Sequence, residues 1–150
     1  MSTLTPPAYN ARVAPLSAPQ RAFLLTLAAR IVPWSSHLGP DRRDALLALI
    51  GDTLATRPPA MQRQFGLFLG VLRFAPVLRY LRPFDRLDAS RQDAVLRRFQ
   101  DCPLALIRSG FWGVRTLIFL GCYGHPDAGA AIAYTPSKDG NAVLHARARR

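Results

Sequence analysis

Apolar residues recur at three- and four-residue steps along most of the chain, the spacing that buries one face of an α-helix. Prolines and capping residues divide this pattern into segments, as where Ser17 precedes the first segment and Pro33 follows it. The expected helices lie at about residues 17–32, 40–57, 60–75, 76–81, 88–99, 103–122 and 126–133. Asp88 and Ser90 are both candidate caps for the fifth, and residues 34–40 are expected to form a loop.

The alternation of apolar and polar residues that marks a half-buried strand is not found, and the chain has no repeat of 20–50 residues. The pattern therefore predicts an all-α fold, a compact bundle of six or seven helices at residues 17–134. Residues 1–16 are rich in proline and alanine and are expected to form an extended arm. Residues 135–150 end in the basic sequence Arg147-Ala148-Arg149-Arg150 and are expected to form a flexible basic tail.

The most informative segment is 101–134, which is mostly apolar and rich in aromatic residues. We expect Pro103 in the first turn of a long helix that ends near Cys122, before a break at 121–124. Aromatic and arginine side chains contribute most often to interface energy. The candidate anchors, for a partner interface or for the core, are Phe111, Trp112, Arg115 and Tyr123. For the aromatic anchors, the core is the preferred of the two roles.

A transmembrane segment is not expected in this chain. A spanning helix needs roughly 20 consecutive residues with almost no charge. The most apolar run, 116–123, is much shorter, and Arg108 and Arg115 interrupt the longer stretch.

The charge is unusual, because nineteen arginines and one lysine face nine aspartates and no glutamate, a net charge of +11. Such a balance suits nucleic acid, an anionic membrane surface or an acidic protein partner. Ser90-Arg91-Gln92 followed by Arg97-Arg98 is weakly compatible with a DNA-reading helix. The apolar segment 65–81 argues against a simple basic reader, so a nucleic-acid partner is the less favoured interpretation.

Candidate catalytic chemistry is sparse. Cys122, His125 and Asp127 lie close in sequence but lack the second ligand pair of a structural zinc site. His37 follows two serines without the G-x-S-x-G context of a hydrolase nucleophile, and no nucleotide-binding glycine motif occurs. We therefore assign no catalytic, cofactor-binding or metal-binding residue to this chain, and whether it belongs to an enzyme is left open.

A family resemblance rests on two groups of motifs. One comprises Phe84-Asp85-x-Leu87, Arg97-Arg98-Phe99, Pro103-Leu104-x-Leu106-x-Arg108-x-Gly110-Phe111 and Cys122-Tyr123-Gly124-x-Pro126, closing in Ala131-Ile132-Ala133-Tyr134. The other is Leu16-Ser17-x-x-Gln20-Arg21 followed by 27–33. Over roughly residues 16–134 the chain resembles the small helical subunit or N-terminal helical region of certain FAD-dependent GMC oxidoreductases. These include fatty-alcohol-oxidase-like enzymes and the gluconate 2-dehydrogenase subunit 3 group.

The resemblance implies that FAD and the catalytic residues belong to a separate large flavoprotein subunit. This chain would then be a non-catalytic accessory subunit, in a hetero-oligomer, that stabilises an alcohol oxidoreductase and covers its substrate entrance or acceptor site. The substrate alcohol and the stoichiometry stay open. Periplasmic members commonly bear a twin-arginine signal, which is not seen here, so a cytoplasmic location is expected; a periplasmic or membrane location through a partner is the alternative. The competing function is a basic helical module for nucleic acid or an anionic membrane surface.

Overall fold

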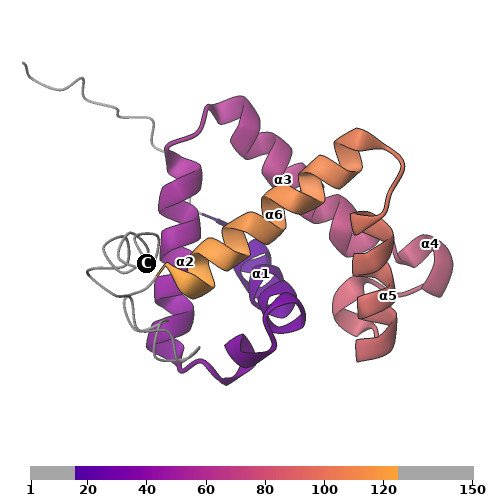
Figure 1. Ribbon diagram of the computed structural model, residues 1–150, viewed down its shortest axis with the longest axis horizontal. Coiled ribbons are helices and arrows are strands. Elements are labelled where there is room, and N and C mark those ends of the chain that lie inside the picture. The colour runs from indigo at the N-terminus through magenta and orange to yellow at the C-terminus, as the bar shows by residue number, and fades with distance from the viewer. Residues whose placement is uncertain (1–15, 125–150) are drawn as a thin grey trace, which may run out of the picture.

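The residues that the structure describes fold into helices. The computed structural model describes residues 16–124 and has no strand among them (Figure 1). The elements, with η for a short 3-10 helix, are α1 (Ala18–Ile31), η1 (Pro33–His37), α2 (Pro40–Ala55), α3 (Pro59–Phe74), α4 (Val77–Tyr80), η2 (Phe84–Arg86), α5 (Ala89–Gln100) and α6 (Ala105–Tyr123). The predicted all-α class is confirmed. The predicted arm up to residue 15, the helix at 126–133 and the tail at 135–150 lie outside the described residues.

Local capping chemistry sets several of the helix ends. Ser17 and Gln20 form a reciprocal capping box, in which each backbone N–H donates to the other residue's side chain, at 2.9 Å and 3.4 Å. Of the two candidate caps for α5, Asp88 is the one used: its Oδ1 accepts from the backbone N–H of Arg91 at 2.9 Å. The predicted caps of both helices are thus confirmed.

Two local predictions were wrong. The segment 34–40, expected as a loop, contains η1, because Pro33 presets a helical φ and Ser35 N–H donates back to the carbonyl of Val32. Pro103 was expected inside the first turn of α6, but the helix begins at Ala105. Leu104 is extended, and Arg108 Nη1 donates to the carbonyl of Cys102 at 2.9 Å, which holds the preceding turn outside the helix.

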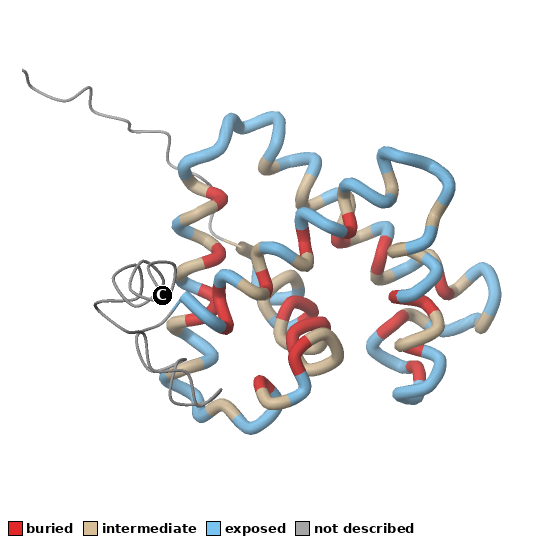
Figure 2. Tube along the Cα trace, viewed as in Figure 1, coloured by how far each residue is buried: buried red, intermediate tan, exposed pale blue. Residues whose placement is uncertain are grey.

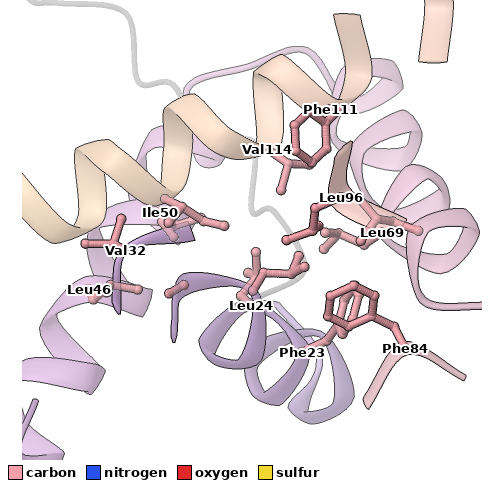
Figure 3. Close-up of a cluster of buried hydrophobic side chains, with 14 of the residues drawn as sticks. Phe23, Leu24, Val32, Leu46, Ile50, Leu69, Phe84, Leu96, Phe111 and Val114 are labelled. Atoms are coloured by element: carbon pink, nitrogen blue, oxygen red, sulfur yellow. The ribbon is translucent and has the colours of Figure 1, made fainter. Parts of the chain in front are cut away.

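One core lies where α1, α2 and α6 meet and continues towards α3 and α5 (Figure 2). Buried side chains from these five helices and from η2 converge on it, including Leu24, Ile50, Leu69, Leu96 and Val114 (Figure 3). α6 runs diagonally across the molecule and contacts α1, α2, α3 and α5. The helix that the sequence singled out is therefore the one that joins the bundle together.

The contact between α2 and α6 requires a glycine. A Cβ atom at Gly121 would lie 3.0 Å from Leu46 Cγ and 3.2 Å from the Leu46 carbonyl oxygen. Since the second of these atoms is backbone, it cannot rotate away, and a side chain here would force the two helices apart. Gly121 thus sets the close approach of the two helices.

The link that contains Phe84-Asp85-x-Leu87 is also part of the core. Phe84 is fully buried and packs edge-on against Phe23 of α1, with 5.7 Å between the ring centroids. Its carbonyl accepts from the buried amide Nε2 of Gln92 at 3.1 Å. Gln92, considered above as a base-reading residue, is therefore occupied inside the protein.

Candidate interaction surfaces

The four predicted anchor residues divide between core and surface. Phe111 is 2% exposed and packs in the core, the role preferred for it from the sequence. Trp112 and Tyr123 are 46% and 41% exposed, and Arg115 is partly buried. Only the two exposed aromatic side chains have a substantial area left for a partner.

The exposed anchors belong to a continuous row of stacked side chains along α6. The Arg115 guanidinium lies between two rings, 4.9 Å from the centroid of Trp112 and 5.1 Å from that of Phe119. Tyr123 continues the row beyond Phe119, and its ring meets Trp34 of η1 edge-on at 5.6 Å. Trp34 Nε1 also donates to the Tyr123 hydroxyl oxygen at 3.3 Å. This row therefore fastens α6 to η1.

Arg115 is held further by α5, because its Nη1 donates to Gln100 Oε1 at 3.3 Å. Its Nε is buried without a hydrogen-bond partner. Phe119 was not proposed from the sequence, although its position, four residues from Arg115 and from Tyr123, could have indicated it. Trp34 could not have been found this way, because only the tertiary fold brings η1 to the end of α6.

A neighbouring flank of α6 borders an open apolar groove. This α2–α3–α6 groove has a volume of about 750 Å³ and is lined by side chains of these three helices. Leu67 of α3 and Leu106 of α6 line it and are 71% and 84% exposed. Arg57, between α2 and α3, is the only charged side chain in its lining. The groove is thus an apolar surface with a single positive edge.

Two glycines on this flank have different surroundings. A Cβ atom at Gly110 would lie 2.7 Å from the ring of Phe68, so this glycine allows α6 to cross α3 closely. At Gly113 a Cβ atom would have no neighbour within 4 Å. Close packing between α6 and α3 is therefore found at Gly110, whereas Gly113 faces open space in the groove.

The two cysteines are free thiols. Burial raises the pKa of Cys122 to about 11, so its thiol stays protonated at neutral pH and reacts slowly.

Within residues 16–124 no group of three or more metal-ligand side chains occurs. His125 and Asp127, considered with Cys122 as ligands, lie outside the described residues. His37 is exposed at the end of η1, and the adjacent Ser36 hydroxyl donates to the Pro33 carbonyl.

α6 also has the length and composition of a membrane-spanning helix, and 28% of its most apolar window is buried. Core helices of soluble proteins meet the same criteria, so length and composition are weak evidence for a span. α6 contributes Phe111, Val114 and Ile118 to the core. The absence of a transmembrane segment stays a prediction.

Comparison of the chain with models of known protein families, with curated proteins and with solved structures finds no match.

Proposed function

We propose that this protein is a non-catalytic accessory subunit that binds and stabilises the large subunit of a FAD-dependent GMC-type alcohol oxidoreductase. The flavin and the catalytic residues would belong to that partner, and this chain would cover its substrate entrance or acceptor site. The sequence resemblance over residues 16–134 motivates the choice of partner. The observation that carries a docking role is the exposure of α6.

α6 is the most apolar helix described, yet much of its surface is uncovered. Besides Trp112 and Tyr123, it exposes Leu106 (84%) and Leu120 (40%). Exposed apolar patches of several hundred Å² are uncommon on monomeric proteins and often mark interaction sites. Covering such a patch contributes about 25 cal/mol per Å² before the costs of association. A partner that covers α6 would therefore stabilise both chains.

The α2–α3–α6 groove extends this surface. Leu67 and Leu106 line it from two helices, so an apolar segment of the partner would bury both leucines together. Arg57 at the edge has no carboxylate partner among residues 16–124. We therefore expect the docking segment of the flavoprotein to be apolar with an acidic residue at its margin.

A second candidate function, binding to an anionic surface, is favoured by a different observation. Arg79, Arg82 and Arg98 also have no carboxylate partner within the described part of the chain. They lie around α4 and α5, and none of them lines the α2–α3–α6 groove.

The test is purification of the tagged chain from its native host, followed by a visible absorption spectrum of the purified material. The proposal expects a hetero-oligomer that contains a large chain and bound flavin. Recovery of the chain alone, monomeric and without flavin, would overturn it.

A matched pair of variants then tests the docking surface. Leu67→Asp places a charge in the groove and is expected to remove at least about 90% of the co-purified flavoprotein, because an unpaired carboxylate would be buried at the interface. Leu81→Asp changes an equally apolar, 86% exposed side chain outside the groove and is expected to leave the complex intact. A complex that survives Leu67→Asp would place the docking surface elsewhere.

A further inference from the structure

The most exposed apolar side chains of the described residues lie together at one corner of the fold. We define the α4 corner as residues 77–82, which comprise α4 with the two residues that follow it. Leu78 is 93% exposed and Leu81 is 86% exposed. α4 stands at the edge of the bundle beside α5 (Figure 1). Neither leucine belongs to the buried core.

Leu81 adopts an unfavourable backbone conformation. Its φ is 54°, in the left-handed region, and no other non-glycine residue among those described has a positive φ. This region costs free energy for a residue with a Cβ atom, and glycine or asparagine would adopt it more readily. A leucine that is both strained and exposed does not stabilise the fold. Its side chain is therefore a candidate for contact with a binding partner.

The charge around this corner is positive and largely uncompensated. Asp85 accepts from Arg73 at 2.6 Å, while Asp88 caps α5 and pairs with Arg91 at 3.3 Å. Asp93 is paired with Arg30 of α1. These three aspartates therefore pair with other arginines, and none of them pairs with Arg79, Arg82 or Arg98.

Two of these arginines also border an apolar pocket beside the corner. The pocket has a volume of about 700 Å³, and its lining includes Leu78, Val95 and Phe99. Arg79 and Arg98 are the only charged side chains in that lining. The corner thus presents apolar groups and guanidinium groups without a carboxylate partner on one surface, although Arg79 also lies 5.7 Å from the centroid of the Tyr80 ring. This arrangement suits a molecule with an anionic head and an apolar chain.

We propose that the α4 corner docks on an anionic lipid bilayer, with Leu78 and Leu81 inserted at the interface and Arg79, Arg82 and Arg98 bound to lipid phosphates. Arginine side chains near an anionic membrane gain electrostatic attraction, and short apolar elements add affinity by entering the headgroup region. Nucleic acid would engage the arginines but would gain little from exposed leucines, because its recognition uses phosphates, base edges and stacking. This inference rests on the second candidate function, binding to an anionic surface, and does not depend on the flavoprotein proposal.

The experiment is co-sedimentation of the full chain with vesicles. One set contains phosphatidylglycerol and phosphatidylcholine in equal parts, and the other contains phosphatidylcholine alone. The chain is expected to bind the first set and not the second. Replacing Arg79, Arg82 and Arg98 with glutamine should weaken binding about 100-fold, which is about fivefold for each arginine, or about 1 kcal/mol each. Leu78→Asp with Leu81→Asp should weaken it at least about tenfold.

The matched controls are a leucine of the α2–α3–α6 groove and two other arginines that have no carboxylate partner among residues 16–124. Two controls change residues outside the α4 corner: Leu67→Asp, and Arg57→Gln combined with Arg63→Gln. Each should keep the affinity for anionic vesicles within about threefold of that of the unmodified chain. Electrostatic attraction decays over about 10 Å, so charges away from the bound surface contribute little. Circular dichroism of each variant establishes that it is folded. Equal binding to both vesicle sets, no binding to anionic vesicles, or equal losses in the control variants would overturn the proposal. Stronger binding to a single-stranded oligonucleotide than to anionic vesicles would also overturn it, in favour of nucleic acid.

Discussion

The α2–α3–α6 groove and the α4 corner both expose leucine, but they differ in the charges beside it. The groove has Arg57 alone in its lining, whereas the pocket beside the α4 corner is bordered by Arg79 and Arg98. Leu67 in the groove is 71% exposed and Leu81 at the corner is 86% exposed. Exposure of an apolar side chain therefore does not define a partner.

The two surfaces also differ in shape. The groove is open to solvent but is bordered by three long helices, and an apolar segment of another protein can bind between them. The corner projects from a four-residue helix, so its leucines can enter a soft surface such as a lipid headgroup layer without being enclosed. From this difference we expect the two surfaces to respond differently to salt and to substitution.

The largest expected contrast is in salt dependence. Raising the salt from about 0.1 M to about 1 M shortens the Debye length from about 10 Å to about 3 Å, which removes most of the attraction between exposed charges. Binding of the chain to anionic vesicles should then fall by up to about 100-fold, the contribution of three arginines. The complex with the flavoprotein, held by apolar contacts, should keep its affinity within about threefold. Co-sedimentation measures vesicle binding, and size-exclusion chromatography measures the complex with the flavoprotein. Equal salt dependence of the two would contradict the difference between the groove and the α4 corner.

A smaller effect is expected from two alanine substitutions in α6. Gly110→Ala should lower the free energy of unfolding by about 1 kcal/mol, because the new methyl group displaces the Phe68 ring from its edge-on contact with Phe99. Gly113→Ala should raise it by up to about 1 kcal/mol, because alanine favours the helix and meets no neighbour. Urea denaturation followed by circular dichroism measures both. Stabilisation by both substitutions would mean that α6 does not cross α3 closely at Gly110.

The smallest effect concerns the strained residue at the corner. Leu81→Asn should raise the free energy of unfolding by about 0.5–1 kcal/mol, because asparagine tolerates the left-handed conformation better than leucine. The same variant should bind anionic vesicles less tightly. Leu78→Asn is the control: it removes an equally exposed leucine from a right-handed helical position and should weaken vesicle binding without raising stability. Thermal denaturation of the two variants distinguishes them, and equal stability changes would show that the strain at Leu81 has no energetic consequence.

Much of the fold could be predicted from local chemistry. Ser17 with Gln20, and Asp88 with the backbone of Arg91, begin their helices through groups within a few residues of one another. Such interactions are present in the sequence as short patterns. The start of α6 was misplaced because a contact between Arg108 and the Cys102 carbonyl, rather than a capping motif, shapes the turn before it.

The candidate surfaces could be predicted only in part. The sequence by itself determined that the chain is helical, apolar along 101–123 and strongly basic, since these follow from composition and periodicity. It did not determine that Phe111 is buried while Leu106, in the same helix, is exposed. That outcome depends on where α2, α3 and α5 lie against α6, and on contacts such as Trp34 with Tyr123 between distant segments. Periodicity shows which residues share a helix face, but only the packing of other helices decides which of those faces is covered.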